Sequence, residues 1–533
     1  MRYLFLSIVS ILYSVTLCAQ PTNWYVSPDG TNNLTSGNGA SPSLPLQTIQ
    51  YAVNTAWNPG DTIFVMNGTY RNNGYGSGSL SNGAVVSLNG NNVAGTENGW
   101  LIITNYPGHS PKIQFDGAGG FIGNNQSYLE ISGFEIEGPN QQITHTEALA
   151  NRLIHDKYFS GRGIAIWSGH HIYVHHNKVH DCPNSGIRMN NGDYCTVDNN
   201  EVYNNTWWSS SAESAIVFAT AMAIDTRDTI KMIMTNNLVY DNYNTIPFYN
   251  GTPVGGGSDY GTVDQDYIID GSGCYVTRNK DTYFHGWFYF ANNISYGNGI
   301  NGLVVHKTNR AYVINNTTFK NGATPLSMGR QSSSGITVNA SASVRMHNNI
   351  SWPKYSSDFG YKIFNAGSSG DLIASNNILA SGRSDLAANQ YSLVNPQFVD
   401  TLNRDFHLTA TSPAIDAGIN HPHMALFDFE GKRRDALSPD LGALEWKAAL
   451  SNTADVSAKL VVYPNPSKDY LILEGERKEW NSIGLYTLQG IDLWSEHLVS
   501  DSSPTRLRLD IQSLPSGIYF LTTSNTIHKI YKL

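Results

Sequence analysis

An asparagine pair followed by an apolar residue recurs along the middle of the chain and constrains the fold more than any other feature. The intervals from Asn177 to Asn200 and from Asn293 to Asn316 are both 23 residues long. A repeat of this length is typical of a β-solenoid, in which each repeat is one coil. Asparagine tolerates the left-handed backbone of a corner and can form hydrogen-bonded ladders between coils. The pairs are Asn199-Asn200, Asn236-Asn237, Asn292-Asn293, Asn315-Asn316, Asn348-Asn349 and Asn376-Asn377, with His176-Asn177 as a variant.

Three short strands accompany each repeat. One alternating segment precedes the pair, as in residues 171–175, and a second follows it, as in residues 201–203. A third follows a glycine corner, as in residues 301–305. Three strands and three corners per repeat predict an all-β chain whose body, residues 20–446, is a right-handed parallel β-helix.

Two intervals are too long for a coil of fixed perimeter. Asn200 and Asn237 are 37 residues apart, and Asn237 and Asn293 are 56 apart. We expect the excess residues, 206–231 and 242–287, to leave the stack as loops. Because they occur in consecutive coils, they should rise over one face and form the binding surface.

The ends of the chain differ from its middle. Arg2, an apolar stretch from Leu4 to Leu17 and a small-residue exit predict a cleaved signal peptide over residues 1–19. Residues 46–53 predict an amphipathic helix that covers the first coil. The body should close with the segments 412–418 and 439–445. A polar linker, 447–457, then leads to a small β-sandwich, 458–533.

Composition excludes some partners. The formal charge is −9 and only 14% of residues are charged, so we expect no nucleic-acid binding. An anionic substrate would have to meet a local cluster of Arg, Lys and His. Cys182, Cys195 and Cys274 fit no zinc spacing; we interpret them as buried core residues, although a Cys182–Cys195 disulfide stays open.

The tail resembles the C-terminal sorting domain of the type IX secretion system of Bacteroidota. The resemblance is carried by Tyr463-Pro464-Asn465-Pro466, the turn at Gly490 and the closing residues 514–519. It implies export to the cell surface or the medium by that secretion machinery.

The body resembles bacterial β-helix enzymes such as chondroitinase B-like and alginate lyases, pectate lyases, carrageenases and fucan-degrading glycosidases. The opening at 59–63 and the closing Asp416-Ala417-Gly418 and Asp440-Leu441-Gly442-Ala443 are similar to theirs. This resemblance implies a polysaccharide substrate, but these folds host both hydrolases and lyases.

The first long interval contains the residues that favour hydrolysis. Trp207 and Trp208 could stack on sugar faces, or could pack the loop onto the coil. Glu213 follows among small residues, where burial would raise its pKa and make it a general acid. The second carboxylate would be Asp270, at a strand end beside a glycine corner, or Asp225.

Basic residues favour a lyase instead. His306 or Lys307 would be the base, and Arg278 or Arg330 would neutralise a uronate carboxyl. With His285 they form a predicted basic strip, which could equally hold a sulfate or carboxylate of a hydrolysed substrate. The acidic group from Asp259 to Asp270 could bind Ca²⁺ through oxygen ligands. The histidines at 170–171 and 175–176 are better explained by stacking than by zinc.

From the sequence we therefore predict a secreted, monomeric, endo-acting glycoside hydrolase. Its substrate would be an anionic, fucan- or carrageenan-like polysaccharide. The hydrolase would need no cofactor or metal, with Ca²⁺ as an open addition. Two alternatives stay open: a polysaccharide lyase on a uronate-containing polymer, and a non-catalytic carbohydrate-binding solenoid.

Overall fold

The computed structural model describes residues 22–446, apart from 56–57, 90–93, 251–262, 265–266, 329–331, 365–371 and 436, and most of the tail strands between 461 and 532. The predicted signal peptide and the linker 447–457 lie outside the described residues. In the described part, no helix is long and apolar enough to cross a membrane.

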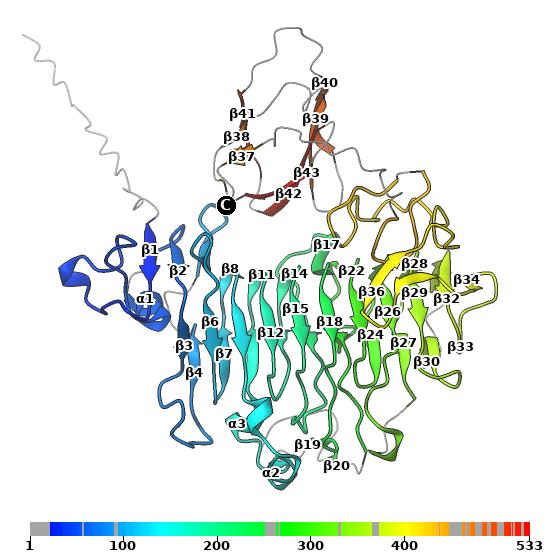
Figure 1. Ribbon diagram of the computed structural model, residues 1–533, viewed down its shortest axis with the longest axis horizontal. Helices are drawn as coiled ribbons and strands as arrows, with labels where there is room; N and C mark the ends of the chain where they lie inside the picture. Colours follow the sequence, from blue (N-terminus) through cyan, green and yellow to red (C-terminus); the bar gives the residue numbers. More distant parts are fainter. Residues whose placement is uncertain are drawn as a thin grey trace, which may run out of the picture.

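Three long parallel sheets form the body, which is a parallel β-helix as predicted (Figure 1). The first sheet has eleven strands, in the order β1 (Asn23–Val26), β2 (Thr62–Val65), β5 (Leu101–Asn105), β8 (Ser127–Ser132), β11 (His170–His175), β14 (Asp193–Asp198), β17 (Ile230–Thr235), β22 (Trp287–Ala291), β25 (Ala311–Ile314), β28 (Val344–His347) and β31 (Ile373–Ser375).

The second sheet also has eleven strands and lies one tight corner further along each coil. Its order is β3 (Thr69–Arg71), β6 (Lys112–Gln114), β9 (Glu135–Glu137), β12 (Lys178–His180), β15 (Glu201–Tyr203), β18 (Leu238–Tyr240), β23 (Ile294–Tyr296), β26 (Thr317–Phe319), β29 (Ile350–Trp352), β32 (Asn377–Leu379) and β34 (Tyr391–Leu393).

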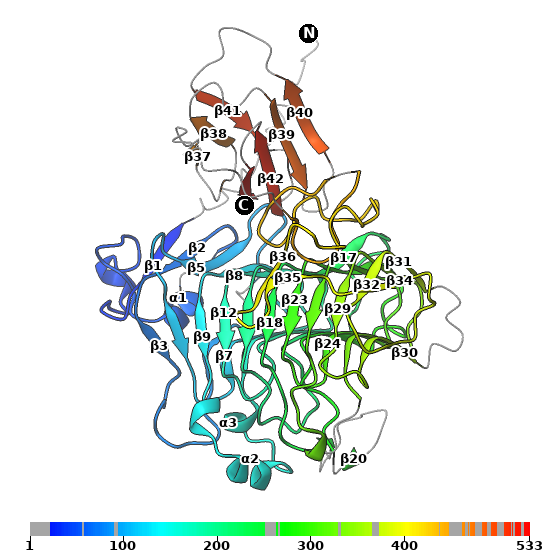
Figure 2. The ribbon, with the colours of Figure 1, turned by 45° about the vertical axis from the view of Figure 1, so that its right-hand side comes forward.

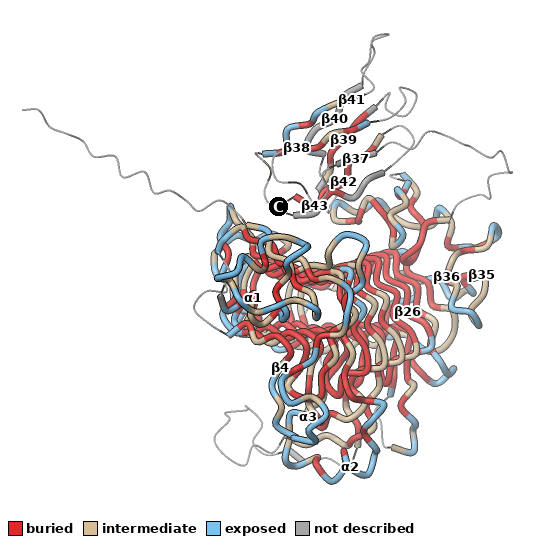
Figure 3. Tube along the Cα trace, turned by 60° about the vertical axis from the view of Figure 1, so that its left-hand side comes forward, coloured by how far each residue is buried: buried red, intermediate tan, exposed pale blue. Residues whose placement is uncertain are grey.

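The third sheet completes each coil with ten strands. Its order is β4 (Ala84–Ser87), β7 (Gly119–Asn124), β10 (Arg162–Trp167), β13 (Ile187–Asn190), β16 (Ile216–Ala219), β21 (Cys274–Thr277), β24 (Asn301–His306), β27 (Ser334–Asn339), β30 (Phe359–Phe364) and β33 (Arg383–Ser384). In most of these strands every second residue points into one continuous apolar core, so the intervening residues lie on the outer face. Figure 3 shows the buried residues running along the strands of all coils.

The two residues of each asparagine pair have different roles at the corner from the first to the second sheet. The first member, and His176 in the variant, has a left-handed backbone with φ between 51° and 59°. The second member is buried and donates its amide to the equivalent asparagine of the next coil at 3.0–3.2 Å. The predicted ladder is therefore confirmed, and it runs through Asn177, Asn200, Asn237, Asn293, Asn316, Asn349 and Asn377.

A second ladder, which the sequence analysis missed, lies at the corner from the second to the third sheet. Asn205 donates to Asn242, Asn242 to Asn298 and Asn298 to Asn321, at 2.9–3.0 Å. These residues are also buried. A rigid corner on this side fixes where the following loops and third-sheet strands begin.

Within the described residues, three helices lie outside the coils. The first, α1 (Ile49–Thr55), begins three residues later than predicted and covers the N-terminal end, with Ile49 and Ala52 in the core. The other two, α2 (His145–Asn151) and α3 (Lys157–Ser160), lie between β9 and β10, and Thr144 caps α2 in a capping box with Glu147. Short 3-10 turns occupy Leu34–Ser36, Asn140–Gln142 and Leu326–Met328.

The two long intervals are not single inserts, which corrects the prediction. The range 206–231 contains β16, and 242–287 contains β21, so each divides into a loop before and a loop after a third-sheet strand. The leading loops do contact each other, because Thr245 donates to the Trp207 carbonyl and Tyr249 to the Ser210 carbonyl. The hairpin β19 (Tyr249–Asn250) and β20 (Val263–Asp264) lies beside α2 and α3 along one edge of the stack (Figures 1 and 2).

The closing segments pack along the side of the stack. Asn315 donates to the Asp440 carbonyl, and Gly442 donates to the Asn348 carbonyl. The hairpin β35 (Phe398–Asp400) and β36 (Asp405–Leu408) buries Phe398 and Phe406 against the second sheet. Residues 412–418 and 439–445 therefore cover the corner between the first two sheets.

The tail forms two antiparallel sheets that share one core, in agreement with the predicted sandwich. One has the order β37 (Val461–Tyr463), β38 (Tyr470–Glu474), β41 (Arg506–Asp510), and the other β40 (Asp492–His497), β39 (Ser482–Thr487), β42 (Gly517–Thr523), β43 (Ile527–Lys532). Leu473 of the first packs with Leu485 and Leu521 of the second.

Candidate functional site

The outer face of β10, β13, β16, β21 and β24 carries several side chains that are capable of acid–base chemistry. Parallel register places one row of outward residues side by side: Trp167, Asn190, Ala219, Thr277 and His306. A second row contains Ala165, Arg188, Val217, Tyr275 and Val304. Glu213 and Asp270 stand just before β16 and β21, at the edge where the leading loops join.

Two arginines hold Glu213 on this face. The Arg162 Nη2 lies 3.1 Å from one carboxylate oxygen, and Arg188 forms an ion pair with the other. The Ser185 hydroxyl donates to the latter oxygen at 2.8 Å. Burial opposes ionisation of Glu213, which is 4% exposed, but Arg188 and then Arg162 outweigh it, so its pKa lies below the ordinary value. The expected raised pKa of Glu213 is therefore wrong.

Asp270 shows the opposite behaviour in the neighbouring coil. The backbone NH of Gly271 donates to the Glu213 carbonyl at 2.9 Å, which places Asp270 beside Glu213. The Ser214 hydroxyl donates to the Asp270 carboxyl at 3.2 Å. Burial raises the pKa of Asp270 well above its ordinary value, and the negative charge of Glu213 adds to this. The pKa values of the two carboxyls are thus displaced in opposite directions.

A tyrosine and a histidine follow Asp270 along the chain: Tyr275 is on β21, the strand that follows Asp270, and His306 is on β24 in the next coil. The Nδ1 of His306 is 3.0 Å from the Tyr275 hydroxyl and 3.0 Å from the Thr277 hydroxyl. Burial, with the charges of Arg278 and Lys280, lowers the pKa of His306 to about 4, so its ring is neutral at pH 7. The backbone carbonyl of His306 accepts from Arg278, and Arg278 itself is exposed.

Lys307 belongs to the same basic group. It is partly exposed, and its carbonyl accepts from the backbones of Asn279 and Lys280. Of the predicted basic strip, the structure therefore brings Arg278, His306 and Lys307 together, with Lys280 next to them. The structure does not extend it to His285, which is exposed in the loop between β21 and β22, and Arg330 lies outside the described residues.

The structure separates Asp225 from the carboxyl pair, Glu213 and Asp270, because Asp225 follows β16 whereas Glu213 precedes it. The Lys231 ammonium lies 2.6 Å from Asp225, Arg227 lies 2.7 Å away and the Tyr194 hydroxyl donates at 2.9 Å. Although desolvation opposes them, these hydrogen bonds, with that of Lys231 foremost, lower the pKa of Asp225. This arrangement anchors the loop after β16 and gives no acid–base partner for Glu213.

The tryptophan pair packs onto the protein. The indole NH of Trp208 donates to the Asn140 carbonyl at 3.1 Å, and its ring packs against Ile143 and Phe159. Trp207 stacks on Tyr243 with ring centroids 5.1 Å apart. Both rings are only partly exposed. They join the leading loops to each other, so their role in substrate binding stays a prediction.

The histidines stack, as expected. His171 lies between the rings of Tyr128 and Tyr194, each at 4.4 Å. The three cysteines Cys182, Cys195 and Cys274 are buried free thiols in the core, so Cys182 and Cys195 do not form the disulfide.

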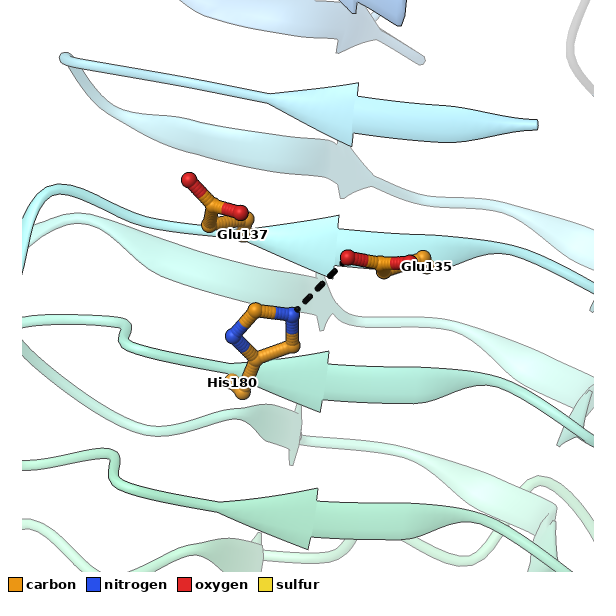
Figure 4. Close-up of side chains that lie close together, drawn as sticks. All are labelled: Glu135, Glu137 and His180. Atoms are coloured by element: carbon orange, nitrogen blue, oxygen red, sulfur yellow. Dashed lines mark hydrogen bonds and ion pairs between the residues drawn. The ribbon is translucent and has the colours of Figure 1, made fainter.

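One group in the described chain has ligand atoms close enough for a metal ion. Atoms of Glu135, Glu137 and His180 lie within 4.8 Å of one another on the second sheet (Figure 4). The Lys112 ammonium already lies 3.0 Å from Glu135 and also pairs with Glu137. A metal would have to displace this lysine. Asp259, Asp266 and the side chain of Asp264 lie outside the described residues, so Ca²⁺ binding there stays a prediction.

Comparison with solved structures finds parallel β-helix proteins at low sequence identity. Pectate lyase Pel9A is 19% identical, with a TM-score of 0.47, over 80% of this chain and 96% of that one. A glycoside hydrolase is 8% identical (TM-score 0.44; 73% and 99% covered), and a rhamnogalacturonan lyase is 14% identical (TM-score 0.38; 67% and 87% covered). No curated protein matches the chain.

The tail is assigned by its family. Residues 461–533 match the secretion system C-terminal sorting domain. The chain therefore carries the tail of a type IX secretion cargo and is directed to the cell surface or the extracellular medium.

Proposed function

We propose that the protein is a secreted enzyme that hydrolyses an anionic polysaccharide on the outer face of the third sheet. The observation that carries this proposal is the carboxyl pair, whose pKa values are displaced in opposite directions. Glycosidic hydrolysis usually requires two neighbouring carboxyls whose pKa values differ in this way. The roles are reversed relative to the sequence prediction, because the pKa of Asp270 is raised and that of Glu213 is lowered, so Asp270 is the better proton donor of the two.

Each residue then has a defined task. Asp270 would donate its proton to the glycosidic oxygen as the bond breaks. Glu213, held by Ser185, Arg162 and Arg188, would act through its carboxylate on the anomeric carbon or on an attacking water. Because both carboxyls are nearly buried, their protonation is set by these neighbours more than by solvent.

Charge supports an anionic substrate. The chain as a whole carries a formal charge of −9, so the bulk surface would repel a polyanion. Arg278 and Lys280 follow β21 and Lys307 follows β24, at the other end of these strands from the carboxyl pair, and the charge of Arg278 reaches Arg188, the partner of Glu213. They supply a local positive potential on the same sheet. The sheet continues beyond the site through β7 on one side and β27 on the other, which suits internal cleavage of a long chain.

A second candidate function, β-elimination, is favoured by His306. A neutral, partly exposed histidine next to a tyrosine hydroxyl offers a base and an acid, and Arg278 could neutralise a uronate carboxyl. This candidate requires a uronate-containing polymer, whereas hydrolysis does not.

The test is incubation with sulfated, carboxylated and neutral polysaccharides, followed by assays of reducing ends and ultraviolet-absorbing unsaturated ends. Hydrolysis predicts reducing ends only, lost in Glu213→Gln and Asp270→Asn but kept in His306→Gln. The exposed, distant Glu97→Gln serves as the control. Unsaturated ends that disappear in His306→Gln would establish a lyase instead. Binding without cleavage would leave the carbohydrate-binding solenoid.

A further inference from the structure

Trp167 stands on the same outer face and has no part in the chemistry above. It ends β10, where Ile164 and Ile166 point into the core, so alternation directs Trp167 outward. Its ring is partly exposed. Unlike Trp207 and Trp208 it is fixed on a strand, which holds a binding residue more rigidly than a loop does.

Arg162 links this ring to the carboxyl pair. Its guanidinium carbon lies 5.7 Å from the centre of the Trp167 ring, while its Nη2 is 3.1 Å from Glu213. In the described chain its Nε is buried without a hydrogen-bond partner. A buried donor left unpaired is costly, and a ligand oxygen could satisfy it.

A third polar group lies in the adjacent strand. Asn190 is the register partner of Trp167 and is partly exposed. Its carbonyl oxygen accepts from Arg188 Nε at 2.9 Å, which orients the amide group. Within the described residues, its NH₂ group makes no hydrogen bond and is available to an acceptor on a ligand.

We propose that Trp167, Arg162 and Asn190 form a subsite for an acidic sugar of the polysaccharide, an inference that rests on the outer face being the substrate site. The aromatic ring would stack on the apolar face of the sugar, and Arg162 would bind its carboxylate or sulfate. Strands lie about 4.8 Å apart, so β10 to β24 spans roughly 19 Å. An extended polysaccharide crossing these strands would place this sugar on the side of the carboxyl pair opposite to His306.

Binding measurements test the subsite independently of the reaction. The Asp270→Asn protein is combined with Trp167→Ala, with Trp167→Phe, or with Trp287→Ala as control. Trp287 is also partly exposed and stacks on Tyr312, but it lies on the first sheet. Affinity is measured by electrophoresis and calorimetry against the same sulfated, carboxylated and neutral polymers.

We expect Trp167→Ala to weaken binding at least about tenfold, or about 1.4 kcal/mol, while Trp167→Phe and Trp287→Ala bind like the parent. Arg162→Gln should weaken binding of anionic polymers more than of neutral ones. Unchanged binding by Trp167→Ala, an equal loss in Trp287→Ala, or a parent that binds no polymer would overturn the subsite. Normal binding by a wild type that produces no new ends would contradict only the proposed hydrolysis.

Discussion

Replacing Arg188 by methionine should show how strongly the Arg188 guanidinium stabilises the buried Glu213 carboxylate. The substitution keeps most of the apolar volume of Arg188 and removes its charge. Glu213 would remain 4% exposed, with Ser185 and the partly exposed Arg162 as its partners. Breaking one side of a buried ion pair costs about 3–5 kcal/mol. Because Arg162 remains, we expect the lower end of this range, about 3 kcal/mol.

The loss should be visible in thermal unfolding of the body. An unfolding entropy of roughly 2.1 cal/mol/K per residue gives about 0.9 kcal/mol/K for residues 22–446. If these coils unfold together, about 3 kcal/mol corresponds to a Tm lower by about 3 °C. This change in Tm is measured by calorimetry of Arg188→Met and of the double variant Arg188→Met with Glu213→Gln. The exposed Arg71→Met is the control. The double variant should recover part of the loss, because it contains no unpaired carboxylate.

The pH dependence gives a sharper signature. In the wild type, the lowered pKa of Glu213 means that its contribution to stability is present above the unfolded-state pKa and disappears only as pH falls through the folded-state value. In Arg188→Met, burial should raise this pKa, so the penalty is largest at neutral pH and is relieved by protonation. The Tm deficit should therefore shrink from about pH 8 to about pH 5. A deficit that is independent of pH, or no larger than that of Arg71→Met, would refute this reasoning.

Three further outcomes are expected. Asn237→Ala should lower stability by about 2–5 kcal/mol, because it removes the Oδ1 that accepts from the backbone NH and the side-chain amide of Asn200, and the amide that donates to the Val197 carbonyl, whereas the exposed Asn389→Ala should change the calorimetric Tm little. Hydrolysis should decline as pH rises through the raised pKa of Asp270, since the acid must be protonated, and a rate that keeps increasing with pH would contradict this role. Removing residues 461–533 should retain the body inside the cell, as fractionation and immunoblotting would show, and normal secretion would contradict the role of the tail.

Several features of the site could not be predicted from the sequence. Glu213 among small residues correctly predicted burial, but the sign of its pKa shift depends on Arg162 and Arg188, which are 51 and 25 residues away. Asp225 has the residue type of a second catalytic carboxylate, but β16 separates it from Glu213, which the sequence did not reveal. Trp167 carries no signal in its local sequence beyond strand alternation.

The sequence by itself determined the coil. Repeated asparagine pairs and alternating strands are local patterns, and stacking identical coils converts each one into a ladder or a sheet. It also determined the route of export, because the tail motifs are read as a contiguous segment. Only the tertiary structure decided which charges meet on the outer face of the third sheet. The register between coils and the lengths of the loops set these distances, and the opposite pKa shifts of Glu213 and Asp270 follow from them.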